Sequence, residues 1–378
     1  MVSKRRQLAL PHLRRLRSLW KEEVRPITLA DLDAFEGRNA DALRAAKRTH
    51  TEVMRRIGHR LQDFLQLPYK VMACPSVHQV FEKYVNAYLI HEEMQKMSSA
   101  TAATDYWCAL ADVFSDHRDV TRLLGNGRNE VEALDAEQLL GFDAFLYRFF
   151  TARIGSHLLG AAFLNSGPVP EGKSKPAGVS LGVLQSTDAV SAVRDIAWTM
   201  VANVMGRQVD VRSVVEVEGP PEVRILYVPS LFRVILREVL RNAVEARQRH
   251  AEARGHEEPP VQVRVNRGRV GVFVTVSDRG GGVADAAHVW SWGSGQTDST
   301  SGMQSSEWWL QEPGQPSLSP SDIAAGNAAT PLGFGLPVAR LTARYFGGDV
   351  QLQSLLGYGT NVYIHIPELQ RQGTLDNC

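Results

Sequence analysis

Cysteine is scarce in this sequence of 378 residues, which contains only Cys74, Cys108 and Cys378. Because they are far apart and no pair has the spacing of a zinc-binding motif, the sequence indicates neither a disulfide framework nor a structural zinc site. So few isolated cysteines are typical of proteins in a reducing compartment.

Long apolar runs and a strong overall charge are also missing. No run approaches the roughly 20 apolar residues of a membrane-spanning helix, so no transmembrane span is expected. The formal net charge is only +1, and seven of the 42 basic residues lie within positions 1–21, which contain no acidic residue. The rest of the chain is therefore net acidic, which argues against a nucleic-acid-binding body.

The basic N-terminus has a pattern of its own. Its leucines recur at helical spacing, at positions 10, 13, 16 and 19. An arginine-rich, acid-free and amphipathic start is the composition of a mitochondrial transit peptide, so residues 1–27 are predicted to form a targeting segment that is at least partly removed. A solvated basic helix, or a helix lying on a membrane surface, is the alternative.

The length predicts two domains, and the first, residues 28–165, shows helical periodicity with almost no strand signal. Four apolar stripes predict a four-helix bundle. The stripes cover Leu43–Phe64, Val77–Tyr88, Tyr106–Leu124 and Ala133–Phe163. The stretch Asn165–Ala177 is rich in glycine, proline and serine, and it is predicted to be a linker.

The second domain, residues 178–368, mixes helical and strand patterns. Valines alternate with polar residues on both sides of a turn at 266–268, as in a β-hairpin. A segment rich in glycine, serine, glutamine and proline, at about 290–330, is predicted to be a mobile lid. The remaining predicted elements are helices at Ser191–Met205, Leu231–His250 and Gly333–Tyr345, and strands at Val350–Ser354 and Thr360–Ile366.

The helix Leu231–His250 carries two polar residues next to its apolar stripe. Glu238 and Asn242 are four residues apart, so they project from one face of the helix. A carboxylate and an amide beside a core are costly unless they are paired or used. A carboxylate can deprotonate a hydroxyl group, and an amide oxygen can bind Mg²⁺.

Two glycine-rich motifs follow this helix. Asp278 ends the hairpin and precedes Gly280 and Gly282, which suits an acceptor for an exocyclic amino group with a flat base close by. Gly333 and Gly335 open a helix, where free amides suit phosphate oxygens. Each motif is weak alone, and their specificity lies in their order along the chain.

That order resembles the ATP-binding fold shared by gyrase, heat-shock chaperone, histidine-kinase and mismatch-repair ATPases, the GHKL or Bergerat-type α/β sandwich. The resemblance implies an α+β protein in which a four-helix bundle precedes this ATP-binding domain.

The first half narrows the resemblance to the mitochondrial 2-oxoacid dehydrogenase kinases. It is similar to them in RIGHRLQDFLQLPYKVMACPSVHQVFEKYVNAYL (56–89), DHRDVTRLL (116–124) and FLYRFFTARIGSHLL (145–159). The later stretches LREVLRNAVEA (236–246), SDRGGGV (277–283), GFGLP (333–337) and ARYFGGDVQLQSLLGYGTNVYI (343–364) are similar too. Within the family, the sequence of the bundle and the short tail after Ile366 favour the kinases of the branched-chain complex over those of the pyruvate complex.

Site roles follow from the resemblance, position by position. Glu238 would be the general base, and His117 would contact it. Asn242 would bind Mg²⁺, and Arg153 and His157 would line a regulatory pocket in the bundle. The residues implied in ATP binding are Asn242, Asp278, Gly280, Gly282, Gly333, Phe334, Gly335, Leu336 and Thr360. The implied cofactors are ATP and Mg²⁺, with K⁺ as a further candidate.

The resemblance also implies a function. The protein would be a serine kinase of the mitochondrial matrix that phosphorylates the decarboxylase subunit of a 2-oxoacid dehydrogenase complex. The branched-chain complex is the favoured substrate, and the pyruvate complex is the second choice. The kinase would be a homodimer docked on the lipoyl-bearing core, with no nucleic-acid partner.

Three departures keep alternatives open. Pro331 stands where the family has the first glycine of its phosphate loop, Glu245 replaces an arginine, and His157 replaces a second pocket arginine. A nucleotide-binding regulatory protein with little kinase activity is therefore one alternative. A histidine autokinase, with His91 as phosphoacceptor, is another, but the Arg-Thr-Pro continuation expected after His91-Glu92 is missing.

Overall fold

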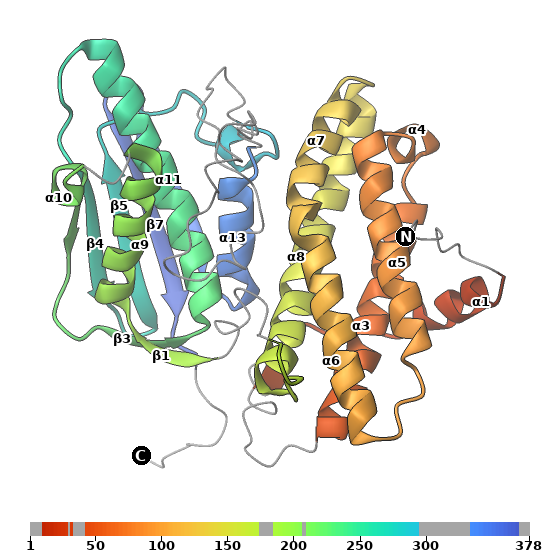
Figure 1. Ribbon diagram of the computed structural model, residues 1–378. Coiled ribbons are helices and arrows are strands. Elements are labelled where there is room, and N and C mark those ends of the chain that lie inside the picture. Colours follow the sequence, from red (N-terminus) through yellow and green to blue (C-terminus); the bar gives the residue numbers. More distant parts are fainter. Residues whose placement is uncertain are drawn as a thin grey trace.

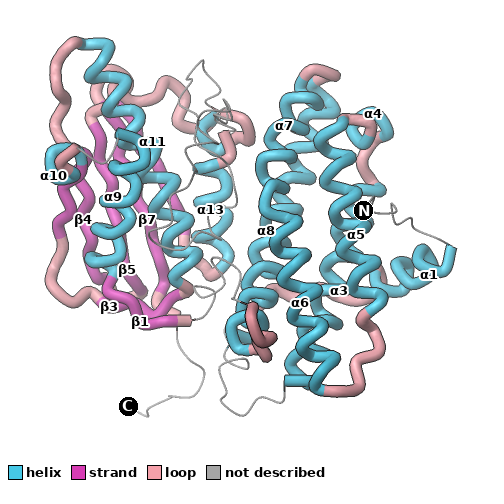
Figure 2. Tube along the Cα trace, in the orientation of Figure 1, coloured by secondary structure: helices cyan, strands magenta, loops and turns pink. Residues whose placement is uncertain are grey.

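The computed structural model describes residues 10–28, 31–32, 42–173, 184–205, 209–294 and 333–369. These residues form two halves that stand side by side, a helical bundle and an α/β domain (Figures 1 and 2). The α+β class and the order of the two halves agree with the prediction. Within the described ranges, no helix is both long enough and apolar enough to cross a membrane.

Helix starts in the bundle follow from local chemistry. Its long helices are α3 (Ala42–Leu65), α5 (Pro75–Glu93), α6 (Ala100–Asp116), α7 (Val120–Glu132) and α8 (Ala136–Ser166), with the short α4 (Tyr69–Met72) after α3. Proline opens α5, and the side chains of Ser99 and Asp135 accept hydrogen bonds from first-turn amides of α6 and α8. The stripe Tyr106–Leu124, expected to form one helix, is divided by the 3₁₀ turn η1 (His117–Asp119).

Aromatic side chains fill the centre of the bundle. Phe64 of α3 lies edge-on to Phe145 of α8, with ring centroids 5.0 Å apart, and Tyr84 and Phe149 flank it. All four side chains are buried. Tilted and edge-to-face aromatic pairs stabilise a core beyond the area that they bury, so this cluster joins α3, α5 and α8.

The N-terminal helix α1 (Leu10–Leu19) packs against α3. Leu16 and Leu19 are buried, and the indole N–H of Trp20 donates a hydrogen bond to the Gly58 carbonyl at 2.9 Å. The predicted targeting segment, residues 1–27, includes this packed helix, and its role in targeting stays a prediction. The leucine spacing that suits a transit peptide also supplies a face that packs on a bundle.

The α/β domain is built on a five-stranded sheet in the order β2-β4-β5-β7-β6. Only the pair β2–β4 is parallel. Its strands are β2 (Val215–Glu218), β4 (Val261–Arg267), β5 (Gly271–Asp278), β6 (Asp349–Leu355) and β7 (Gly359–Pro367). The predicted hairpin is β4–β5, but its turn starts later than expected, because Asn266 and Arg267 still pair with β5.

Helices cover one face of this sheet (Figure 1). They are α9 (Ala189–Met205), α11 (Pro229–Arg254) and α13 (Gly335–Tyr345), and all three were predicted to within a few residues. The short elements β1 (Gln185–Asp188), α10 (Val211–Val214), β3 (Arg224–Tyr227) and η3 (His288–Trp290) were not predicted, nor was β2. β1 pairs with β3 in a separate two-stranded sheet.

The two halves meet where α8 lies against α13 (Figure 1). Near one end, Phe150 of α8 stacks on Trp292 with ring centroids 5.1 Å apart. Near the other, the hydroxyl of Tyr345 accepts a hydrogen bond from the backbone N–H of Ile27 at 2.9 Å and lies against Gly155 of α8. The bundle, the N-terminal segment and α13 are thus held together at this junction.

Candidate active site

Glu238 is a buried carboxylate in the middle of α11, with 2% of its surface exposed. Its Oε2 forms an ion pair with Nη2 of Arg241 at 2.6 Å, and its Oε1 is buried with no hydrogen-bond partner among the described residues. Asn242, one turn further on, is only partly buried. Glu238 and Asn242 therefore lie on one face of α11, and Oε1 of Glu238 can still accept a hydrogen bond.

The glycine loop before α13 lies directly against this carboxylate. A Cβ atom on Gly335, the first residue of α13, would overlap Oε2 of Glu238. Gly333 has a φ of +62°, and its carbonyl accepts a hydrogen bond from Gly293 N–H at 3.1 Å. No side chain among the described residues caps the N-terminus of α13, and free amides at a helix start suit an anion such as phosphate. Pro331 lies outside the described residues.

Phe334 has a different role from the glycines around it. Its buried ring packs against Trp292 and Phe150, with centroids 4.9 and 5.8 Å away. The prediction that Phe334 belongs to the ATP-binding loop can therefore hold only for its backbone. Leu336, which follows Gly335, packs partly buried against the core. Both side chains anchor the loop to the junction between the two halves.

Asp278 ends β5 at the opposite end of the site. Its carboxylate accepts a hydrogen bond from Gly280 N–H at 2.8 Å and another from the backbone of Thr360, its partner in the β5–β7 ladder. Burial raises the pKa of Asp278, and these two hydrogen bonds oppose the rise. Ser354, which was not predicted, joins this cluster because its hydroxyl lies 3.2 Å from that of Thr360.

Two glycines after Asp278 are required by close packing. A Cβ on Gly280 would come within 2.6 Å of the backbone of Ala246 in α11. Gly282 has a φ of +68° and lies against the backbone of Leu355. His250 of α11, also not predicted, lies beside Gly281. The loop can therefore lie flat against α11 only with glycine at these positions.

These contacts place the motifs in line along α11. Glu238 touches Gly335 and Ala246 touches Gly280, and their separation of eight positions along the helix is a rise of about 12 Å. Asn242 lies halfway. A nucleotide with its base at Asp278 and its phosphates at Gly335 would therefore pass Asn242. Among the described residues, no group of three or more His, Cys, Asp or Glu side chains is arranged to hold a metal ion.

The contacts of His117 within the described residues lie inside the bundle, and its expected contact with Glu238 stays a prediction. Its carbonyl accepts a hydrogen bond from Arg153 Nη2 at 2.9 Å, and its ring lies against Tyr84 with centroids 4.8 Å apart. Burial, with the Arg153 charge beside it, lowers the pKa of His117 to about 3. His117 is thus a neutral side chain inside the bundle.

The bundle contains a pocket, which we call the bundle pocket. It brings Arg153 and His157 together, as predicted, and adds Arg56 and Arg60 of α3, which were missed. Their four-residue spacing on a helix with a buried face was the signal that could have revealed them. The full lining is Val53, Arg56, Ile57, Arg60, Tyr84, Leu110, Val113, Phe114, His117, Arg153, Ser156 and His157.

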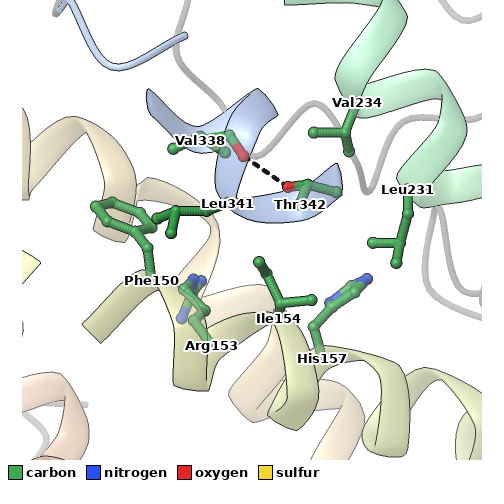
Figure 3. Close-up of a pocket in the computed structure, with 9 residues that line it drawn as sticks. All are labelled: Phe150, Arg153, Ile154, His157, Leu231, Val234, Val338, Leu341 and Thr342. Atoms are coloured by element: carbon green, nitrogen blue, oxygen red, sulfur yellow. Dashed lines mark hydrogen bonds between the residues drawn. The ribbon is translucent and has the colours of Figure 1, made fainter. Parts of the chain in front are cut away.

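A second pocket lies between the two halves (Figure 3). Phe150 and Ile154 of α8 face Leu231 and Val234 of α11 and Val338, Leu341 and Thr342 of α13 across it. Arg153 and His157 line both pockets. A single stretch of α8 therefore separates the bundle pocket from the helices that carry Glu238 and Gly335.

Two family profiles match separate parts of the chain. One, described as mitochondrial branched-chain alpha-ketoacid dehydrogenase kinase, matches residues 26–165. The other, described as histidine kinase-, DNA gyrase B- and HSP90-like ATPase, matches residues 228–370. The first covers the bundle, and the second covers α11 to β7 with every predicted ATP-binding residue.

Relatives extend the similarity over most of the chain. A protein of Arabidopsis thaliana named pyruvate dehydrogenase (acetyl-transferring) kinase, mitochondrial, is 26% identical over 331 residues, which cover 86% of this chain and 85% of the relative. Isozyme 4 of the same kinase from Mus musculus is 26% identical over 366 residues, covering 92% and 82%. A Schizosaccharomyces pombe kinase of that name is 35% identical over 156 residues, covering 39% and 33%. The fold, the site and these similarities identify the chain as a member of the mitochondrial 2-oxoacid dehydrogenase kinase family, and so as an ATP-dependent protein kinase.

Proposed function

We propose that this kinase transfers the γ-phosphoryl group of MgATP to a serine on the decarboxylase subunit of a 2-oxoacid dehydrogenase complex. The observation that carries the proposal is the contact between Glu238 and Gly335, which places a buried carboxylate against the start of α13. A base and a phosphate-binding helix end must be adjacent if a hydroxyl is to attack a phosphorus atom.

The roles of the residues follow from this arrangement. Oε1 of Glu238 would accept the proton of the substrate hydroxyl, because Oε2 is held by Arg241. Asn242 would hold Mg²⁺ through its amide oxygen, and the first amides of α13 would bind phosphate oxygens. ATP would supply the phosphoryl group, and Mg²⁺ would neutralise part of the negative charge of its phosphates. Most of the rate would come from positioning and charge stabilisation.

The choice between two complexes rests on two opposed observations. The sequence of the bundle favours the branched-chain complex, and so does the description of the family profile that matches residues 26–165. The branched-chain complex remains our proposal. The relatives, however, are named for pyruvate dehydrogenase. We further propose that the protein acts in the mitochondrial matrix as a homodimer docked on the lipoyl-bearing core. The word mitochondrial in the relatives' names supports the organelle.

The bundle pocket would receive a regulatory acid. Arg56, Arg60 and Arg153 line it, so a carboxylate would find positive charge on two sides. A branched-chain 2-oxoacid is the effector that fits the proposed substrate.

A labelled-ATP assay tests the function. The purified protein is given the branched-chain and pyruvate complexes at equal concentration, and acid-stable phosphate on each decarboxylase subunit is followed with time. Faster labelling of the branched-chain subunit is expected. Preference for the pyruvate complex would overturn the substrate choice alone. Acid-labile phosphate would indicate a histidine autokinase, and ATP binding without turnover would indicate a regulatory protein.

A further inference from the structure

Arg241 lies between two carboxylates on the same face of α11. Its Nη2 is 2.6 Å from Oε2 of Glu238, and its Nε is 3.9 Å from Oε1 of Glu245. Glu238 precedes it by three residues and Glu245 follows it by four, so both lie within one helical turn of it. The Arg241 side chain is 23% exposed, so water screens these charges only partly.

The surroundings of Glu238 leave Arg241 as its direct hydrogen-bond partner. Arg237, the preceding residue, is a second positive neighbour, and burial lowers its pKa to about 10. Within the described residues, the Glu238 carboxylate accepts one hydrogen bond, which comes from Arg241. Oε2 faces Gly335 as well, whereas Oε1 is buried without a partner in the described part of the chain.

A carboxylate held at one oxygen by a guanidinium has a fixed plane, so its other oxygen points in one direction. We propose that Arg241 is a positioning residue, which holds Oε2 of Glu238 so that Oε1 receives the proton of the substrate hydroxyl. Glu245 holds Arg241 in turn. This inference rests on the proposed kinase function and extends it to a residue that does not react.

The arrangement also gives Glu245 a role. A carboxylate at this position could weaken binding of a negatively charged nucleotide. The Glu245 carboxylate forms an ion pair with Arg241. Burial raises the pKa of Glu245, and the positive charges of Arg241 and Arg249 oppose this rise. Its negative charge therefore acts on the guanidinium that orients the base.

Arg241→Gln and Arg241→Lys test the positioning role, with Arg249→Gln as the matched control. Arg249 is exposed on the same helix, and the substitution removes the same charge without touching Glu238. With either complex as substrate, Arg241→Gln should lower kcat by about 10- to 100-fold, the scale expected for a misplaced catalytic group. The KM for ATP should change less than about 2-fold, Arg241→Lys should recover part of kcat, and the control should match wild type.

Glu245→Gln provides a second test that leaves the Glu238–Arg241 pair in place. It should lower kcat by a few-fold with the KM for ATP unchanged, since it removes only the outer partner. If Arg241→Gln instead raises the KM for ATP while kcat is kept, Arg241 is a phosphate ligand and the inference is wrong. If wild type and Arg241→Gln are equally active, the ion pair has no positioning role. An inactive wild type would overturn the proposed function and the inference together.

Discussion

Glu238 and Asn242 share one face of α11 but have separate roles in the proposed reaction. Glu238→Gln keeps the shape of the side chain and removes its basicity, so phosphotransfer should fall by about 10²- to 10⁴-fold while ATP still binds. Asn242→Ala removes the proposed Mg²⁺ ligand, so nucleotide binding itself should weaken. Titration of each variant with MgATP, beside the labelled-phosphate assay, separates the two effects. A Gln variant with wild-type turnover would exclude Glu238 as the base.

His157 is a titratable side chain of the bundle pocket, so its pKa decides whether its charge changes near neutral pH. A histidine with its ordinary pKa would strengthen inhibition by an acid as the pH falls through about 6.5. Burial, with Arg153 beside it, instead lowers the pKa of His157 to about 3. The side chain is therefore neutral down to about pH 4, and it gains charge only below that range.

We accordingly expect inhibition by a branched-chain 2-oxoacid to owe no pH dependence to His157 between pH 6 and 8. His157→Arg supplies a permanent charge and should tighten inhibition by ~1–2 kcal/mol, the scale of a charged hydrogen bond. Inhibition constants for wild type, this variant and His288→Arg, an exposed control, decide the matter. Equal constants in all three would mean that the acid binds elsewhere.

At the scale of elements, the start of α13 depends on one glycine. Gly335→Ala would press a methyl group onto the Glu238 carboxylate and Arg241. Overpacking of this kind should lower the free energy of unfolding by ~1–3 kcal/mol, and phosphotransfer should fall because the base and the helix start move apart.

Gly141→Ala is the control for this substitution. Gly141 lies exposed in α8 with no heavy atom within 4 Å of the added carbon. Removing glycine from a helix interior should stabilise the protein by ~0.5–1 kcal/mol. Chemical denaturation of both variants gives the comparison. A Gly335→Ala protein as stable and active as wild type would show that this contact can open.

Periodicity predicted the elements whose pattern is long. The apolar stripe of α11 and the alternation of β4 and β5 extend over enough residues to be distinct. β1, β2 and β3 have four residues each, too few for a pattern, and they were missed. The break at His117 was missed because apolar residues continue at helical spacing on both sides of η1.

The candidate site was predictable in its motifs and only partly in its contacts. The order of Glu238, Asp278 and Gly335 places them in one ATP-binding fold. Spacing alone does not show that Arg241 turns toward Glu238, or that Phe334 turns away into an aromatic cluster. Side-chain direction depends on tertiary neighbours, which for Phe334 come from the bundle. Most of the predicted lid, from residue 295 onward, lies outside the described residues.

At the scale of the whole molecule, the N-terminal helix is part of the folded body. Leu16→Ala would empty a fully buried site between α1 and α3, so the free energy of unfolding should fall by ~2–5 kcal/mol. Leu13, on the same helix, is 37% exposed, and Leu13→Ala should change stability by less than ~1 kcal/mol. Thermal unfolding of the two variants tests this. Equal melting temperatures for the two variants would show that the packing of α1 on α3 does not stabilise the protein.

The hydrogen bond between Ile27 and Tyr345 spans 318 residues of chain. During synthesis or translocation the Ile27 end emerges first, yet its acceptor arrives only after nearly all of both halves. Closing so long a loop adds entropic cost and slows folding. This contact is therefore among the last to form, and until Tyr345 is in position the bundle and the catalytic helices can fold but cannot be joined there.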